Sequence, residues 1–127
     1  MARVVQLKIQ TENKPGVLAT ICSELAKRAV NITAVMASKE VDGGIRLLAT
    51  PLTAARRVLE ENRFSYTEEE AIAVRITDRP GALGRVTRKL AEAGVNVEYA
   101  YGSIVKGSER ALIVIGVHDL AKAERLL

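Results

Sequence analysis

Apolar and polar residues alternate near the start of the chain, which predicts a half-buried β-strand. Its apolar face carries Val5, Leu7 and Ile9. After a Pro-Gly turn the apolar spacing becomes helical, so one stripe of the helix is expected to face a sheet. This stripe consists of Leu18, Ile21, Cys22, Leu25 and Ala29. Residues 32–38 and 45–50 then predict two strands joined by the turn sequence VDGG.

A second helix and a closing strand complete this pattern. Pro51 suits the first position of a helix capped by Thr50, with Leu52, Ala55 and Leu59 facing inward. Residues 65–70 predict a final strand. The resulting order is the βαββαβ pattern of a ferredoxin-like unit, in which the helices cover one face of an antiparallel sheet.

The chain contains this pattern twice. The stretch TENKPGVLATICSELAKRAVNI is followed 65 residues later by TDRPGALGRVTRKLAEAGVNV, with Pro15 aligned to Pro80 and Gly16 aligned to Gly81. The second copy predicts strands at 72–76, 97–103 and 111–117, the last two around the turn KGSE. Its first helix repeats the stripe as Leu83, Val86 and Leu90, and Asp119 can cap its second helix.

We therefore expect an α+β fold of two ferredoxin-like units packed side by side, with domains at residues 1–70 and 71–127. Three glutamates at 68–70 mark the junction. The last strand of the second unit is missing, because Leu127 aligns with Leu59 inside the second helix. The sheet edge left open invites pairing. We expect this edge to be covered by residues 65–70, by residues outside this chain or by a symmetry mate. A homodimer is predicted.

The charge and composition exclude several classes of protein. The net charge of +4 comes from residues 1–65, with 10 basic and 6 acidic side chains, while residues 66–127 hold 9 of each. These dispersed charges favour a solvated surface over nucleic-acid binding. No apolar run approaches the roughly 20 residues of a membrane span, and the start of the chain lacks the features of a signal peptide, so a cytoplasmic protein without membrane contact is expected. The single Cys22 is expected in the core.

The motifs of the common enzyme classes are missing from the sequence. It contains no GxGxxG, GxxxxGK or HExxH, and His118 has no nucleophile or carboxylate at a catalytic spacing. We predict no catalytic residues, no metal site and no cofactor, and expect His118 to be a surface or capping residue. Tyr99 and Tyr101 share one face of a strand, as in an RNA-recognition motif, but the basic and aromatic RNP1 pattern is absent.

The paired segments ENKPGVL…VNI and DRPGALG…AGVNV, each opening a βαββαβ unit, resemble the ACT family of small regulatory domains. The resemblance covers almost the whole chain. It implies a regulatory, non-enzymatic protein that binds a free amino acid or a similar small effector at the interface between units and acts on a partner enzyme or regulator. A regulatory subunit that acts through a partner without binding ligand itself is the alternative, and an RNA-binding module is a third. Fusion of the copies fixes their pairing at high effective concentration.

The physical chemistry of the Pro-Gly turns agrees with this implication. Gly16 and Gly81 leave the backbone accessible at helix N-termini, where unpaired amides and the helix dipole favour a carboxylate. Asn13 stands where serine-binding ACT domains carry an Asn, and its amide offers a donor and an acceptor to a zwitterion. Asp78 replaces it in the second copy and repels an anion. The expected ligand-binding residues are Asn13, Pro15, Gly16, Val17, Leu18, Asn31, Ile32, Asp78, Gly81, Ala82, Leu83, Asn96 and Val97.

Two other interpretations of these residues stay open at this point. Pro-Gly can simply form a turn, and Asn31 and Asn96 can simply follow helix ends, where Asn is common. Tyr99 and Tyr101 add aromatic bulk where the first copy has Ala34 and Met36. They are expected either to wall a ligand pocket or to pack between the units.

Overall fold

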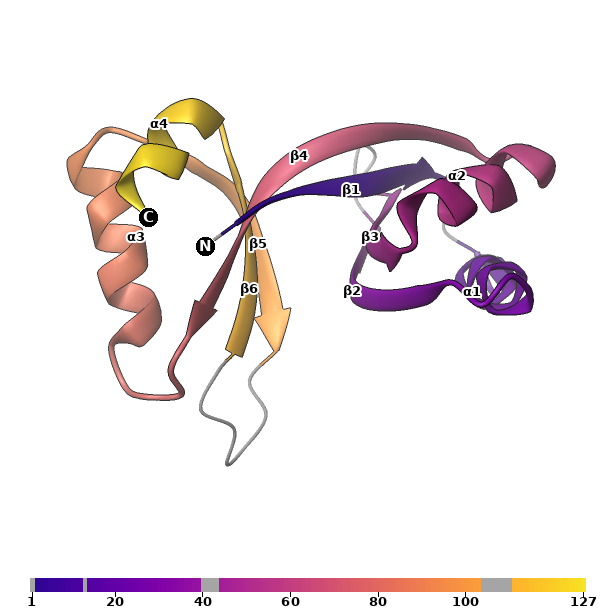
Figure 1. The fold of residues 1–127 in the computed structure, drawn as a ribbon, viewed down its shortest axis with the longest axis horizontal. Coiled ribbons are helices and arrows are strands. Elements are labelled where there is room, and N and C mark those ends of the chain that lie inside the picture. The colour runs from indigo at the N-terminus through magenta and orange to yellow at the C-terminus, as the bar shows by residue number, and fades with distance from the viewer. Residues whose placement is uncertain (1, 13, 40–43, 104–110) are drawn as a thin grey trace. The chain divides into compact units, whose positions relative to one another are not determined.

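The computed structural model describes residues 2–12, 14–39, 44–103 and 111–127. The two hairpin turns expected at VDGG and KGSE lie largely outside these residues. The α+β fold of repeated ferredoxin-like halves is confirmed (Figure 1). The elements in chain order are β1 (Ala2–Gln10), α1 (Val17–Lys27), β2 (Asn31–Ser38), β3 (Gly44–Thr50), α2 (Leu52–Glu61), β4 (Ser65–Ile76), α3 (Ala82–Glu92), β5 (Val97–Ser103), β6 (Ala111–Val117) and α4 (Leu120–Leu126).

The chain divides into two compact units at the middle of β4. The N-terminal unit is Val5–Glu69, and the C-terminal unit combines Glu70–Leu127 with residues 2–4. In the N-terminal unit the strand order is β2-β3-β1, followed by the first part of β4. In the C-terminal unit the order is β5-β6-β4, followed by the start of β1. β1 and β4 therefore each contribute residues to both units.

The second copy has no strand of its own after α4 in the described residues, but its β4 edge is not left open. Residues 2–4 of β1 lie beside it, a solution that none of the three expected covers included. Arg3 ties this segment to the unit, because its guanidinium donates to Glu70 at 3.2 Å and to Glu124 at 2.9 Å. The closing strand expected at 65–70 is continuous with the next strand, because no Gly or Pro interrupts the segment from Ser65 to Ile76.

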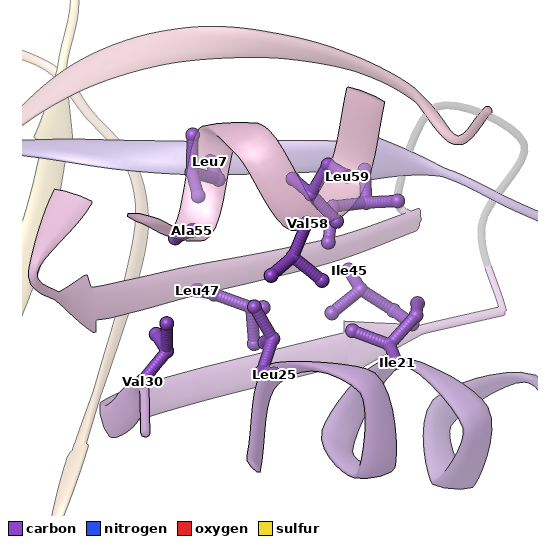
Figure 2. Close-up of a cluster of buried hydrophobic side chains, with 10 residues drawn as sticks. Leu7, Ile21, Leu25, Val30, Ile45, Leu47, Ala55, Val58 and Leu59 are labelled. Atoms are coloured by element: carbon purple, nitrogen blue, oxygen red, sulfur yellow. The ribbon is translucent and has the colours of Figure 1, made fainter. Parts of the chain in front are cut away.

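Each unit has its own hydrophobic core between the helices and one face of the sheet. In the N-terminal unit, pairing of Leu7 with Leu47 and of Ile9 with Ile45 places these side chains on the helix-covered face. Figure 2 shows the core that they form with α1 and α2. Its buried residues are Leu7, Ile9, Ile21, Leu25, Val30, Ile45, Leu47, Ala55, Val58 and Leu59. The second core uses corresponding positions, including Ile72, Val74, Leu90 and Ile115.

The helical stripes are partly different from the prediction. Leu18 and Leu83 are 38% and 43% exposed, while Val17 packs against the first core and Ala82 belongs to the second. The inward stripe therefore begins one residue earlier than predicted and continues through Ile21 and Leu25. Ala29 is exposed, because α1 has already ended and the chain turns there with a φ of 56°. Cys22 is only half-buried.

The predicted caps of the second helices have different outcomes. Pro51 is the N-cap of α2 rather than its first helical residue, and no side-chain hydrogen bond caps this end among the described residues, so the predicted Thr50 cap is wrong. The extended backbone of Pro51 (φ −76°, ψ 143°) starts the helix one residue later. Asp119 does cap α4, accepting the backbone amide of Lys122 at 3.0 Å.

Candidate ligand-binding site

The two Pro-Gly turns place glycine in a left-handed conformation at the start of a helix. Gly16 is the N-cap of α1 with φ 89°, and Gly81 is the N-cap of α3 with φ 87°. Side chains with a Cβ are strained at such angles, so glycine is the natural residue here. Val17 donates to the Lys14 carbonyl at 3.5 Å and Ala82 to that of Arg79 at 3.1 Å, which closes each turn. No atom lies within 4 Å of the position of a Cβ on Gly16.

The N-terminus of α1 carries polarity suited to an anion. Its first turn has no acidic residue, and Thr20 is the first residue whose amide donates a hydrogen bond in the i to i−4 helical pattern, to the Gly16 carbonyl at 2.9 Å. The amides of Leu18 and Ala19 precede it and have no acceptor within the helix. These amides and the helix dipole favour negative charge at this end of α1.

A cavity of about 390 Å³ adjoins this turn in the N-terminal unit. β1 and β2 are both antiparallel to β3, so the C-terminal ends of β1 and β2 lie at the same end of the sheet, where α1 begins. The cavity is bounded by the loop after β1, the first turn of α1, the end of β2 and the start of β3. Its lining residues in the described part of the chain are Thr11, Glu12, Lys14, Val17, Leu18, Ala37, Ser38, Lys39, Gly44 and Ile45.

Both signs of charge line this cavity. Lys14 Nζ lies 3.1 Å from Glu12 Oε2, and both side chains are mostly exposed, so the ion pair itself contributes little to stability. Lys39 adds a further cation. A zwitterion can therefore meet the Glu12 carboxylate, the ammonium groups of Lys14 and Lys39, and the amides at the start of α1. Such a set of groups can bind and orient a small polar molecule.

The structure brings only some of the predicted residues to this cavity. Val17 and Leu18 line it, and Pro15 and Gly16 form the turn beside it. Asn13 lies outside the described residues. Asn31 and Ile32 begin β2 beyond the far end of α1, roughly 16 Å away along an 11-residue helix, and do not line the cavity.

The second turn has a different environment. Gly81, Ala82 and Leu83 repeat the helix start, and the carboxylate Asp78 precedes them. A cavity of about 320 Å³ in the described part of this unit lies between β4, α3 and Leu127. Of the predicted residues only Ala82 lines it. The two units are therefore not equivalent as binding sites.

Asn96 and Val97 lie at the opposite end of α3, as Asn31 and Ile32 do in the first unit. The Asn96 amide donates to His118 Nδ1 at 3.0 Å, and the His118 amide donates to the Asn96 carbonyl at 3.3 Å. His118 is exposed, as one of the two predicted alternatives stated, and its bonds to Asn96 tie the start of β5 to the end of β6. Val97 packs against the second core.

Tyr99 and Tyr101 do share one face of β5, and it is the face away from the helices. Pairing sets Tyr99 opposite Gly116 and Tyr101 opposite Val114, whereas the core residue Ile115 points to the other face. The ring of Tyr99 covers Gly116 so closely that a Cβ there would overlap the ring. Neither tyrosine lines the cavity described for this unit.

Sequence reasoning missed five polar residues of the first cavity: Thr11, Glu12, Lys14, Ser38 and Lys39. Thr11, Glu12 and Lys14 belong to the segment around Asn13 that was already singled out. Ser38 and Lys39 come much later in the chain, and only the predicted topology could have placed them, because β1 and β2 are parallel and end at the same end of the sheet. No group of three or more His, Cys, Asp or Glu residues in the described ranges is arranged to hold a metal ion. Among the helices described, none is long and apolar enough to cross a membrane.

Comparison with known proteins agrees with this architecture. The repeated βαββ arrangement, with a Pro-Gly turn opening the first helix of each copy, defines a tandem ferredoxin-like protein. A family model described as an ACT domain pair matches residues 2–126, and the chain belongs to this family. A search of curated proteins found no significant match.

Several solved structures share the fold. Protein BT0572 from Bacteroides thetaiotaomicron is 29% identical with a TM-score of 0.89, and the match covers 98% of this chain and 86% of that one. The ligand-free regulatory subunit of aspartate kinase from Thermus thermophilus is 17% identical with a TM-score of 0.61, covering 98% and 89%. Aspartokinase III from E. coli, in complex with lysine and aspartate, is 16% identical with a TM-score of 0.58, covering 98% and 29%. At these lower identities the last two similarities concern the fold alone.

Proposed function

We propose that this ACT domain pair is a non-catalytic regulatory protein of the cytoplasm that binds a free amino acid in the cavity beside Gly16. The supporting observation is the coincidence of three features at one place: a cavity of about 390 Å³, the N-terminus of α1, and side chains of both charges. The α-carboxylate lies against the amides of Leu18 and Ala19, near Lys14. The ammonium group faces Glu12, and Asn13 orients the ligand from the same loop. Binding then alters how the protein acts on a partner enzyme or regulator.

A thermal-shift screen of the twenty amino acids tests this proposal. A ligand that binds only the folded state at about 100 times its dissociation constant adds roughly 2.7 kcal/mol to the free energy of unfolding. This corresponds to a rise of roughly 8 °C in the melting temperature for a chain of this size. If no amino acid raises the melting temperature, the alternative of a subunit that acts without ligand replaces the proposal.

Substitutions then locate the ligand. Glu12→Gln should remove most of the ligand-induced shift while changing the unliganded melting temperature little, because the Glu12 side chain is mostly exposed. Asn13→Ala is expected to have the same effect. Lys27→Gln is the matched control: Lys27 pairs with Glu24 at 2.9 Å as Lys14 pairs with Glu12, but at the other end of α1. A full shift retained in both loop variants would show that the ligand binds elsewhere.

We further propose a homodimer formed through the outer strand β2. This strand is an edge of the N-terminal unit, and its Val35 is 47% exposed on the strand face shared with Leu47. An exposed edge with apolar side chains favours pairing with another strand. Light scattering at micromolar concentration should give a dimer, and Val35→Lys should shift it to a monomer. A monomeric wild-type protein would contradict the proposal.

A further inference from the structure

The cavity of the C-terminal unit has an apolar floor and a basic rim. Val74 and Ile76 of β4 form the floor with Ala82 and Val86 of α3, and Leu127 closes one side. Arg85 and Lys89 of α3 also line the cavity. The volume of about 320 Å³ lies at the small end of the range for ligand pockets.

The repeat shows which side chains are smaller around this cavity than at the same positions of the first copy. Val74, Ala82 and Val86 stand at the positions of Ile9, Val17 and Ile21 in the first copy. Together the three side chains are four carbon atoms smaller than their counterparts. Ile9 and Ile21 are completely buried in the first core, so the atoms that fill this region there are absent in the second.

The rim changes along with the floor. Arg85 and Lys89 replace Thr20 and Glu24 of the first copy, which converts a neutral and an acidic position into two cations one helical turn apart. Both are exposed, and neither lies within 4.0 Å of a carboxylate among the described residues. Like charges at this spacing destabilise a helix, and a bound anion relieves that repulsion.

The guanidinium of Arg85 lies near the start of α3. Its Nη1 is 3.6 Å from the position that a Cβ on Gly81 would occupy. An anion at the rim therefore meets Arg85, Lys89 and the positive end of the helix dipole together. Asp78 is exposed on the preceding turn and is not part of the cavity lining.

We propose that this cavity binds a small monocarboxylate with a compact, branched or aromatic apolar body. The apolar floor accepts hydrocarbon and penalises an unpaired polar group, while the two cations hold the carboxylate. A ligand with an ammonium group fits less well, because that group would face two cations, and the lining offers it the hydroxyl of Thr77 but no carboxylate side chain. The site is therefore separate from the amino-acid site proposed for the N-terminal unit, and it does not depend on that proposal.

Titration of the full chain with isocaproate, followed by calorimetry and by methyl NMR, tests this site. We expect saturable binding of one molecule per chain, with the largest shifts at the methyl groups of Val74, Ala82 and Val86. Isocaproamide and isohexylamine, which keep the apolar body and lose the negative charge, should bind at least about tenfold more weakly. Absence of saturable binding, or equal binding of the amide, would overturn the proposal.

Exchange of residues between the copies provides the matched variants. Ala82→Val with Val86→Ile restores the larger side chains of the first copy and should weaken isocaproate binding at least about tenfold. Arg85→Thr changes an exposed position, leaves the core intact and should weaken binding similarly. Arg88→Gln, on the same helix but outside the cavity lining, should bind as the wild type does. Unchanged isocaproate binding in both Arg85→Thr and the double variant would refute the site. A double variant that binds isocaproate as the wild type does and differs only in its oligomeric state would also refute it.

Discussion

At the scale of single residues, the ends of the first helices differ between the copies in one informative position. Ala29 follows α1 with φ 56°, and Gly94 follows α3 with φ 74° at the corresponding place. In both copies, the backbone amide of the following residue donates a hydrogen bond to a carbonyl in the last part of the helix. Val30 donates to the Leu25 carbonyl at 3.0 Å, and Val95 donates to the Leu90 carbonyl at 2.9 Å. This is the usual left-handed helix ending, which glycine adopts without strain and alanine does not.

Ala29→Gly should therefore stabilise the protein, and Gly94→Ala should destabilise it. The left-handed backbone costs alanine about 1–2 kcal/mol, of which about 0.4–1 kcal/mol is offset by the greater freedom of glycine in the unfolded chain. The expected net change is about 0.5–1 kcal/mol in each direction, measured as shifted urea midpoints at an unchanged m-value.

Gly44→Ala is the contrasting variant. Gly44 also has a positive φ, 55°, but a Cβ there would run into the Ile9 carbonyl oxygen, so the loss should be clearly larger than for Gly94→Ala. A lower stability for Ala29→Gly would contradict this account.

At the scale of elements, side chains across the short connection between α2 and β4 hold the two together. The Tyr66 hydroxyl donates to Glu60 Oε1 at 2.8 Å, and Arg56 pairs with Glu68. The hydrogen bond to the Glu60 carboxylate, with smaller effects of burial and of the negative charge itself, raises the pKa of Tyr66 above its ordinary value of 10.0. The protonated tyrosine is thus favoured by folding.

This pKa shift predicts a stability that depends on alkaline pH. A folded pKa above the unfolded one stabilises the protein fully below about pH 10, and the contribution disappears as the pH rises through the higher folded value. The difference in unfolding free energy between wild type and Tyr66→Phe should therefore shrink from about pH 8 to about pH 11. Urea denaturation of both proteins at the two pH values measures it. A difference that does not change with pH would argue against the hydrogen bond, and Tyr101→Phe provides the control for general alkaline effects.

The elements show what the sequence could and could not predict. Local periodicity placed β5 and β6 at the residues where the structure has them, and the Pro-Gly turns located the starts of α1 and α3, because these signals depend on neighbours in the chain. The exposure of Leu18 and Leu83 was not predictable in the same way, since the helical stripe can rotate by one residue without changing its period. Ser38 and Lys39 were missed at the first cavity because only the packing of β2 beside β3 brings them to the Pro-Gly loop.

At the scale of the whole molecule, the two copies are linked by more than chain continuity. β1 and β4 each continue from one unit into the other, so residues 2–4 complete the C-terminal unit while the remainder of β1 lies inside the N-terminal unit. Alignment of the copies could not predict this exchange, because nothing local in the sequence assigns residues 2–4 to the second unit. Residues 2–4, at the start of the chain, therefore belong to the same compact unit as residues 70–127.

Removal of residues 2–4 should accordingly destabilise the C-terminal unit more than the N-terminal one. The deletion exposes the edge of β4 from Glu70 onward and removes the two ion pairs of Arg3, with Glu70 at 3.2 Å and Glu124 at 2.9 Å. Hydrogen exchange followed by mass spectrometry should show faster exchange in residues 70–76 and in α4, while β3 and α2 keep their protection, because exchange reports the free energy of local opening.

Arg3→Ala alone should have a smaller effect, about 1 kcal/mol or less, since the pairs are partly exposed. Arg28→Ala, which removes the exposed pair with Glu61 inside the N-terminal unit, is the matched control and should leave residues 70–76 unchanged. Equal acceleration of exchange in both units after the deletion, or none in residues 70–76, would show that residues 2–4 do not complete the second sheet.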